Sequence, residues 1–130
     1  MIPYRVRDGK LEILVIASSK KHHLVVPKGI KDPGLTAQES AAKEALEEAG
    51  VEGVVADTEV GSYTCEKWGA PCTVAVYPMK VTRLIPEAEW EERHRGRQWL
   101  NPGKAAKQLK QKELGPLVKK LESMLWNIAK

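Results

Sequence analysis

The sequence predicts an α/β (α+β) fold, because strand-like and helix-like segments alternate along the chain. Three observations support this prediction. A hairpin signal opens the chain, a capped and alanine-rich helix follows the first β-rich region, and an amphipathic helix closes the chain after a second β-rich region. The resulting order is β-rich, helix, β-rich, helix, which is typical of a sheet packed against helices.

The first β-rich region contains a hairpin and one shorter strand. Residues 2–7 and 11–18 are rich in apolar and β-branched residues and are joined through Asp8-Gly9, a strong signal for a tight hairpin turn. Residues 23–27 predict another short strand. The glycines and the Asp-Pro-Gly sequence of residues 28–34 predict a loop without regular structure.

A helix is predicted to begin at Thr36, because Glu39 follows at the spacing of a capping box. Gly50 ends this helix. The side expected to be buried consists of Ala42, Ala45, Leu46 and Ala49. Since this side is nearly all alanine, the helix can approach a sheet closely.

The second half of the chain predicts further strands and two helices. The strand-like segments are residues 53–67, 73–83 and 97–100, the first two separated by a turn at residues 68–71. Asn101-Pro102 has the cap and the first-turn proline of a helix start. Residues 116–129 predict a terminal helix, whose apolar stripe consists of Leu117, Leu121, Met124, Leu125 and Ile128.

Length and composition predict one soluble, cytoplasmic domain. The chain has 130 residues and a net charge of +4, which suits a polyanionic ligand without identifying it. Cys65 and Cys72 are too few for a disulfide scaffold and are predicted to be reduced thiols, with a bridge across a hairpin as the alternative. The N-terminus lacks the apolar core of a signal peptide, and the longest early aliphatic run, Ile13 to Ala17, is far too short to span a membrane.

The helix near residue 36 carries an unusual acidic cluster. Glu44, Glu47 and Glu48 are spaced so that their side chains share one face, where each like-charged pair costs roughly 0.2–0.5 kcal/mol. The negative end of the helix dipole adds to this repulsion. One explanation is a solvated acidic face, relieved by a pair between Glu39 and Lys43. The other is a bound cation.

The segment before the helix favours the cation. Pro27, Lys28 and Gly29 lead into a glycine-bearing loop that can place a backbone carbonyl beside the carboxylates. Hard divalent cations such as Mg²⁺ take oxygen ligands of this type and keep water and substrate phosphates in their remaining positions.

Residues 29–51 resemble the Nudix box, whose pattern is G-x5-E-x7-R-E-U-x-E-E-x-G-U, with U a bulky aliphatic residue. The matching positions are Gly29, Glu44, Glu47, Glu48, Gly50 and Val51. Three positions depart from the pattern: Leu35 stands in place of the loop glutamate, Lys43 replaces the arginine, and Ala45 is smaller than the usual aliphatic residue. Lys43 keeps the positive charge but loses the bidentate fork that orients a carboxylate.

The resemblance implies a Nudix-type α/β/α sandwich, with a mixed β-sheet between helices, formed by residues 1–130. The layout of the whole chain is similar to the diphosphoinositol and diadenosine polyphosphate phosphohydrolase branch. The implied activity is Mg²⁺-dependent hydrolysis of a phosphoanhydride, with Mn²⁺ as a substitute. The implied metal ligands are Glu44, Glu47, Glu48 and Gly29, and Glu47 or Glu48 is the implied general base, with Glu66, Glu91 and Glu92 in reserve.

The same resemblance implies a set of phosphate-binding residues: Arg5, Ser18, Lys20 and Lys28, together with Lys43 in the box. Arg5 and the polar segment 18–21 fit ordinary surface positions equally well. The basic run of Arg93, His94, Arg95 and Arg97 is predicted to be solvated.

Two other classes of function stay open. A catalytically silent Nudix-like sensor of polyphosphates would account for Leu35. A small basic nucleic-acid-binding domain would suit the net charge, but it gives no reason for clustered glutamates, and the chain has few aromatic residues. The sequence leaves the substrate open, and it does not separate a monomer from a homodimer.

Overall fold

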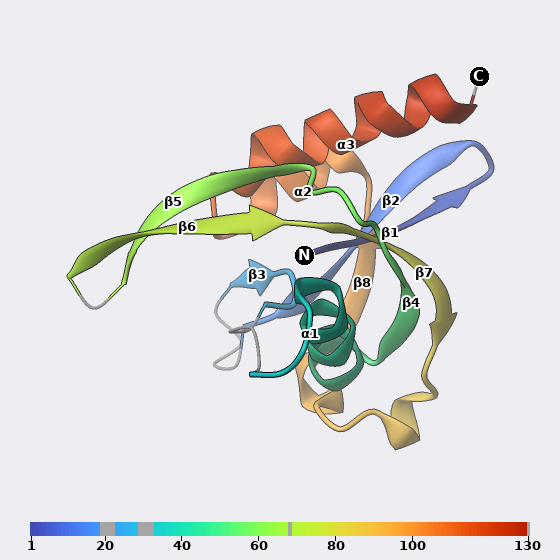
Figure 1. Ribbon diagram of the computed structural model, residues 1–130. Helices are drawn as coiled ribbons and strands as arrows, with labels where there is room; N and C mark the ends of the chain where they lie inside the picture. Colours follow the sequence, from blue (N-terminus) through green and yellow to red (C-terminus); the bar gives the residue numbers. More distant parts are fainter. Residues whose placement is uncertain (19–22, 29–32, 68, 130) are drawn as a thin grey trace.

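The computed structural model describes residues 1–18, 23–28, 33–67 and 69–129 (Figure 1). The strands are β1 (Ile2–Arg7), β2 (Lys10–Ala17), β3 (Leu24–Val25), β4 (Val51–Val55), β5 (Gly61–Lys67), β6 (Ala70–Val76), β7 (Pro78–Leu84) and β8 (Arg97–Leu100). The helices are α1 (Ala37–Glu44), α2 (Pro102–Gln108) and α3 (Leu114–Ala129), with a π turn at Ala45–Ala49 and 3-10 turns at Glu87–Glu89 and Arg93–Arg95. The predicted alternation of β-rich and helical regions is confirmed.

In the part of the chain that the structure describes, the main sheet is mixed and has six strands. Its order is β3-β2-β1-β7-β4, and β8 pairs with β2 outside this path. The β1–β7 pair is parallel, and the other pairs are antiparallel. The Asp8-Gly9 hairpin was predicted correctly, since Arg7 and Lys10 are paired at its end.

Helices cover both faces of this sheet. The strand β2 is accordingly apolar on both sides. Leu11, Ile13 and Val15 belong to a core cluster with residues of α2 and α3. Leu14 and Ile16 point the other way, into a second cluster that includes Ala45 and Ala49 of the π turn. A strand buried on both faces reads as a continuous apolar run, as β2 does. The α/β/α sandwich is therefore confirmed.

The predicted strands at 53–67 and 73–83 each prove to be two strands in two different sheets. β4 pairs with β7 in the main sheet, whereas β5 and β6 form a separate two-stranded sheet. Two hydrogen bonds hold the chain where it passes from one sheet to the other. The Ala56 amide donates to the Pro78 carbonyl (3.0 Å), and the Val60 amide donates to the Val76 carbonyl (2.8 Å). Figure 1 shows this hairpin as a long arm that extends away from the main sheet beside α3.

The C-terminal helices begin as their capping residues predict. The Asn101 side chain accepts a hydrogen bond from the Lys104 amide at 2.8 Å, with Pro102 in the first turn. On α3, Leu121 is buried, and Leu117, Met124 and Leu125 pack against the core cluster. The side chain of Ile128 lies outside the described residues. Among the described residues, no helix has both the length and the apolar character needed to cross a membrane.

Candidate active site

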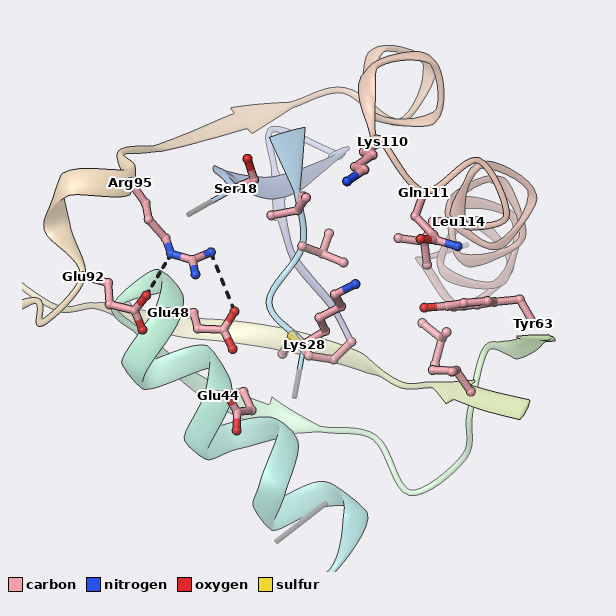
Figure 2. A pocket seen from close by; sticks show the side chains of 15 residues that line it. Ser18, Lys28, Glu44, Glu48, Tyr63, Glu92, Arg95, Lys110, Gln111 and Leu114 are labelled. Atoms are coloured by element: carbon pink, nitrogen blue, oxygen red, sulfur yellow. Dashed lines mark hydrogen bonds and ion pairs between the residues drawn. The ribbon is translucent and has the colours of Figure 1, made fainter. Parts of the chain in front are cut away.

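A cavity of about 500 Å³ opens where α1, the end of β2 and the start of α3 meet the base of the β5–β6 hairpin. Figure 2 shows its two unlike sides: Glu44 and Glu48 project from the helix on one side, and Tyr63, Gln111 and Leu114 lie on the other. Among the described residues, the lining consists of Met1, Ser18, Val25, Val26, Lys28, Glu44, Glu48, Tyr63, Val74, Val76, Glu92, Arg95, Lys110, Gln111 and Leu114.

The helix that carries the carboxylates is fixed at its start as predicted. The Thr36 side chain accepts a hydrogen bond from the Glu39 amide at 3.0 Å, and the Glu39 carboxylate accepts one from the Thr36 amide at 2.9 Å. Ala45 and Ala49 are fully buried against the sheet, whereas Ala42, also predicted on this face, is half-buried. The prediction for Leu46 was wrong: its side chain is 44% exposed, because the last turn is wider than an α-helix.

The π turn also changes how the three glutamates are arranged. A wider turn brings residues four apart closer to alignment, so Glu44 and Glu48 both line the cavity. Glu47 is half-buried but is not among the lining residues. Within the described part of the chain, no group of three or more possible ligands gathers around one point. The shared face expected for all three glutamates is thus found for two of them, and metal binding by Glu47 stays a prediction.

Glu48 has the most perturbed carboxyl group of the cavity. Its pKa is raised from 4.5 to about 8, mainly by burial, then by a hydrogen bond with Glu44 and the repulsion of that neighbouring charge. A hydrogen bond from the Lys28 backbone and the charge of Arg95 act in the opposite direction. A buried carboxyl group whose ionisation is opposed by a neighbouring carboxylate suits a divalent cation, which favours its charged form.

The segment from Trp90 to Arg97 lies against the end of this helix. The Trp90 indole donates a hydrogen bond to the Glu47 carbonyl at 3.2 Å. The Arg97 guanidinium donates to the carbonyls of Ala49 (3.1 Å) and Gly50 (2.8 Å) and stacks on the Trp90 ring at 4.8 Å. These contacts satisfy carbonyls that a helix end leaves without partners.

The prediction of a solvated basic run is therefore wrong for two of its members. Arg97 is engaged at the helix end, and the Arg95 side chain is only 13% exposed beside Glu48 and Glu92. Arg93 and His94 are exposed, as predicted. The charge pattern gave no means of separating the four residues, since the helix-end partners of Arg95 and Arg97, at residues 48–50, lie far away along the chain.

The predicted phosphate-binding residues divide into three groups. Ser18 and Lys28 line the cavity. Arg5 pairs with Glu12 at 2.7 Å and stacks on Trp99 at 4.0 Å, and exposed Lys43 is not among the lining residues. Lys20 lies outside the described residues, and so does Gly29, which was predicted as a metal ligand.

Of the reserve carboxylates, Glu92 lines the cavity, whereas Glu66 and Glu91 are exposed elsewhere. Sequence reasoning did not find Tyr63, Lys110, Gln111 and Leu114. These residues come from the hairpin arm and the junction of α2 and α3, and no local motif marks them. The only signal nearby is the lysine-rich composition of residues 104–112, which fits a solvated surface equally well.

The family model described as the NUDIX domain matches residues 2–121. The chain belongs to the Nudix family. Members of this family generally use divalent metal cations. The mixed sheet, the carboxylate-bearing helix and the cavity above it agree with that membership. Glu44 and Glu48 are suitable oxygen ligands for such a cation.

Similar proteins are found among plant Nudix hydrolases. Nudix hydrolase 17, mitochondrial, of Arabidopsis thaliana is 37% identical over 110 residues, which cover 77% of this chain and 59% of that protein. Nudix hydrolase 12, mitochondrial, of the same plant is 34% identical over 101 residues, which cover 71% of this chain and 49% of that protein. The chain spans about half the length of the curated relatives it matches.

Solved structures with the same fold include a crystal structure of the Caenorhabditis elegans Ap4A hydrolase. Its TM-score is 0.73 at 27% identity, with 95% of this chain and 93% of that chain covered. The solution structure of the Escherichia coli ORF135 protein has a TM-score of 0.61 at 22% identity, covering 100% of this chain and 93% of that one. The similarity to the ORF135 protein supports the fold alone.

Proposed function

We propose that this protein is a pyrophosphohydrolase that cleaves a phosphoanhydride bond in a nucleoside or inositol polyphosphate with the help of Mg²⁺, for which Mn²⁺ can substitute. The observation that carries the proposal is the charge arrangement of one cavity. Glu44 and Glu48 form an acidic side, and the cations of Lys28, Arg95 and Lys110 lie around it. This arrangement suits a metal ion bound together with phosphate groups.

Glu44 and Glu48 would hold the metal ion, and Glu47 is the third proposed ligand. A bound Mg²⁺ supplies Lewis-acid polarisation of a phosphoryl oxygen and a more acidic water. Lys28 and Lys110 neutralise phosphate charge that would otherwise repel a nucleophile. Glu48 is the proposed general base, with Glu47 as the alternative and Glu92 as the reserve residue that lines the same cavity.

The opposite side of the cavity favours a nucleotide over an inositol polyphosphate. Tyr63, Val74 and Leu114 offer an aromatic ring and aliphatic surface, which suit a flat base. A highly phosphorylated inositol would instead need cations around its whole ring. Similarity to the C. elegans Ap4A hydrolase supports the same choice, so a diadenosine polyphosphate is the proposed substrate class and a diphosphoinositol polyphosphate the second.

A silent polyphosphate sensor is the second candidate function. Leu35 occupies the position of the loop glutamate in the box, and Lys43 that of the arginine, so two supporting groups are changed. The acidic side of the cavity argues against the nucleic-acid-binding alternative, because it would repel a phosphate backbone in the absence of metal. A cytoplasmic location remains our proposal, whereas the plant relatives are named as mitochondrial.

The test is release of phosphate or nucleotide from a panel of diadenosine polyphosphates, diphosphoinositol polyphosphates, nucleoside triphosphates and nucleotide sugars, with and without Mg²⁺. We expect metal-dependent turnover that falls by at least about 100-fold in Glu48→Gln. Glu122→Gln, a change at an exposed position on α3, is the matched control and should retain full activity. Tight binding of a polyphosphate without turnover of any compound would favour the sensor.

A further inference from the structure

Arg95 is held in place by acceptors from two parts of the fold. Its Nε donates a hydrogen bond to Glu92 Oε1 at 2.8 Å, within the same 3-10 turn region. One of its terminal nitrogens donates to the carbonyl of Ala17, at the end of β2, at 3.4 Å. With 13% of the side chain exposed, the guanidinium group is anchored from its own loop and from the sheet.

This anchored charge faces Glu48. The shortest distance from the Arg95 guanidinium to the Glu48 carboxylate is 3.8 Å, and Figure 2 shows Arg95 between Glu92 and Glu48. A contact of 3.8 Å is an ion pair and is too long for a hydrogen bond. The carboxylate oxygens of Glu48 are therefore attracted by Arg95 without being occupied by its donors.

The opposing force on Glu48 comes from Glu44. When both are ionised, as metal binding requires, the two carboxylates repel each other within one cavity, and the Glu48 side chain, only 14% exposed, has little water to screen that repulsion. The guanidinium group of Arg95, held on the side of Glu48 away from Glu44 (Figure 2), limits the orientations that the Glu48 side chain can adopt. Arg95 is suited to this task because its planar fork binds several acceptors at once.

The box itself offers no arginine for this purpose. Its arginine position is occupied by Lys43, which is exposed on α1 and is not among the residues that line the cavity. We propose that Arg95 is a positioning residue that orients Glu48 for metal binding, and that Glu92 in turn holds Arg95. This inference depends on the proposed role of Glu48 as a metal ligand. It assigns a part in the site to the β7–β8 connection, which lies outside the box.

A different role for Arg95 would be direct contact with a substrate phosphate, since it also lines the cavity. The two roles predict different effects. A positioning residue changes metal affinity in the absence of substrate and lowers kcat, whereas a phosphate contact raises KM and leaves metal affinity unchanged.

The experiment measures Mn²⁺ binding by electron paramagnetic resonance without substrate, followed by steady-state kinetics. The variants are Arg95→Gln, Arg95→Lys, Glu92→Gln and the double variant Arg95→Gln/Glu92→Gln. Arg93→Gln is the matched control, because Arg93 belongs to the same 3-10 turn but is exposed. We expect Arg95→Gln to weaken Mn²⁺ binding and to lower kcat by about 10- to 100-fold each, the usual effect of removing a partner of a metal ligand.

Four further results are expected. Glu92→Gln gives a smaller loss, because the Ala17 carbonyl still holds Arg95. The double variant is no worse than Arg95→Gln alone, because both changes act through one chain of contacts. KM stays within about threefold of the wild-type value, and Arg93→Gln behaves as wild type. Thermal melts establish that each variant is folded. If Arg95→Gln does not fold, Arg95→Lys is the test variant, because it keeps the positive charge and loses the planar fork. We then expect an intermediate loss of Mn²⁺ affinity.

Several outcomes would overturn the proposal. Unchanged Mn²⁺ affinity with a raised KM would make Arg95 a phosphate contact. Tighter Mn²⁺ binding in Arg95→Gln would make it a competitor of the metal. Additive losses in the double variant would separate Glu92 from Arg95. If the wild-type protein itself binds no Mn²⁺, the proposed function fails, and that result is distinguishable from a failure confined to Arg95.

Discussion

Replacing Glu48 by glutamine should stabilise the metal-free protein at alkaline pH. The pKa of Glu48 is raised in the folded protein from 4.5 to about 8, first by burial and then by Glu44. The folded state therefore holds a proton that the unfolded chain releases at lower pH. No penalty arises below about pH 4.5, and stability is lost as the pH rises toward about 8. Glutamine resembles the protonated acid at every pH, so the variant should escape this loss.

The size of the stability difference follows from the shift in the pKa of Glu48. One pKa unit corresponds to about 1.4 kcal/mol. Because the Glu48 side chain keeps some contact with solvent, we expect less than the full shift would give, roughly 2–4 kcal/mol between pH 5 and pH 8. For a domain of this size, that difference corresponds to roughly 5–15 °C in Tm.

The assay is thermal unfolding of the wild type, Glu48→Gln and Glu122→Gln across this pH range in the presence of a chelator. The difference between wild type and Glu48→Gln isolates this carboxyl group, since all other groups titrate in both proteins. Glu122→Gln should follow the wild type. Adding Mg²⁺ at pH 8 should raise the Tm of the wild type and not that of Glu48→Gln. Parallel pH profiles for these two proteins would refute the argument that burial and Glu44 oppose ionisation of Glu48.

Three other changes test the rest of the site. Thr36→Ala removes the side-chain half of the capping box and should lower stability by about 1 kcal/mol, measured by urea unfolding. Gly50→Ala should destabilise by about 2 kcal/mol or more in the same assay, because Gly50 has φ of 63° and an added Cβ would lie 2.7 Å from both Trp90 and Arg97. Tyr63→Leu should raise KM for a diadenosine polyphosphate by about tenfold, the loss of an aromatic contact, and leave kcat unchanged.

The parts of the fold that were predicted correctly are those specified by neighbouring residues. Asp8-Gly9 determines a turn with its own backbone preferences, and Thr36 with Glu39 caps a helix within one turn. The buried alanines followed from helical periodicity alone. The division of residues 53–67 and 73–83 into four strands could not be predicted in this way, because pairing partners decide where the chain leaves one sheet and enters another.

The same distinction between features set by neighbouring residues and features set by the folded chain applies to the candidate site. Its acidic helix was found because the glutamates lie close together in the sequence. Tyr63, Lys110 and Gln111 reach the cavity from the hairpin arm and from the α2–α3 junction, and only the folded chain brings them near Glu48. The outcome for Leu46 and Glu47 depended on the π turn, which the sequence gave no reason to expect in place of an α-helical turn.

The acidic helix is better understood together with the segment that packs against its end. Negative charge at Glu47 and Glu48 is unfavourable near a helix C-terminus. The fold compensates at the backbone, where Trp90 and Arg97 donate to the last carbonyls of the turn. It compensates only in part at the side chains, because Arg95 stands 3.8 Å from Glu48 and already donates a hydrogen bond to Glu92. The backbone is thus satisfied by the protein, whereas Glu48 ionises only against the cost of burial and the repulsion of Glu44. A divalent cation would offset that cost by favouring the charged form of the carboxyl group, which gives a physical reason for glutamates that repel one another when the chain is considered alone.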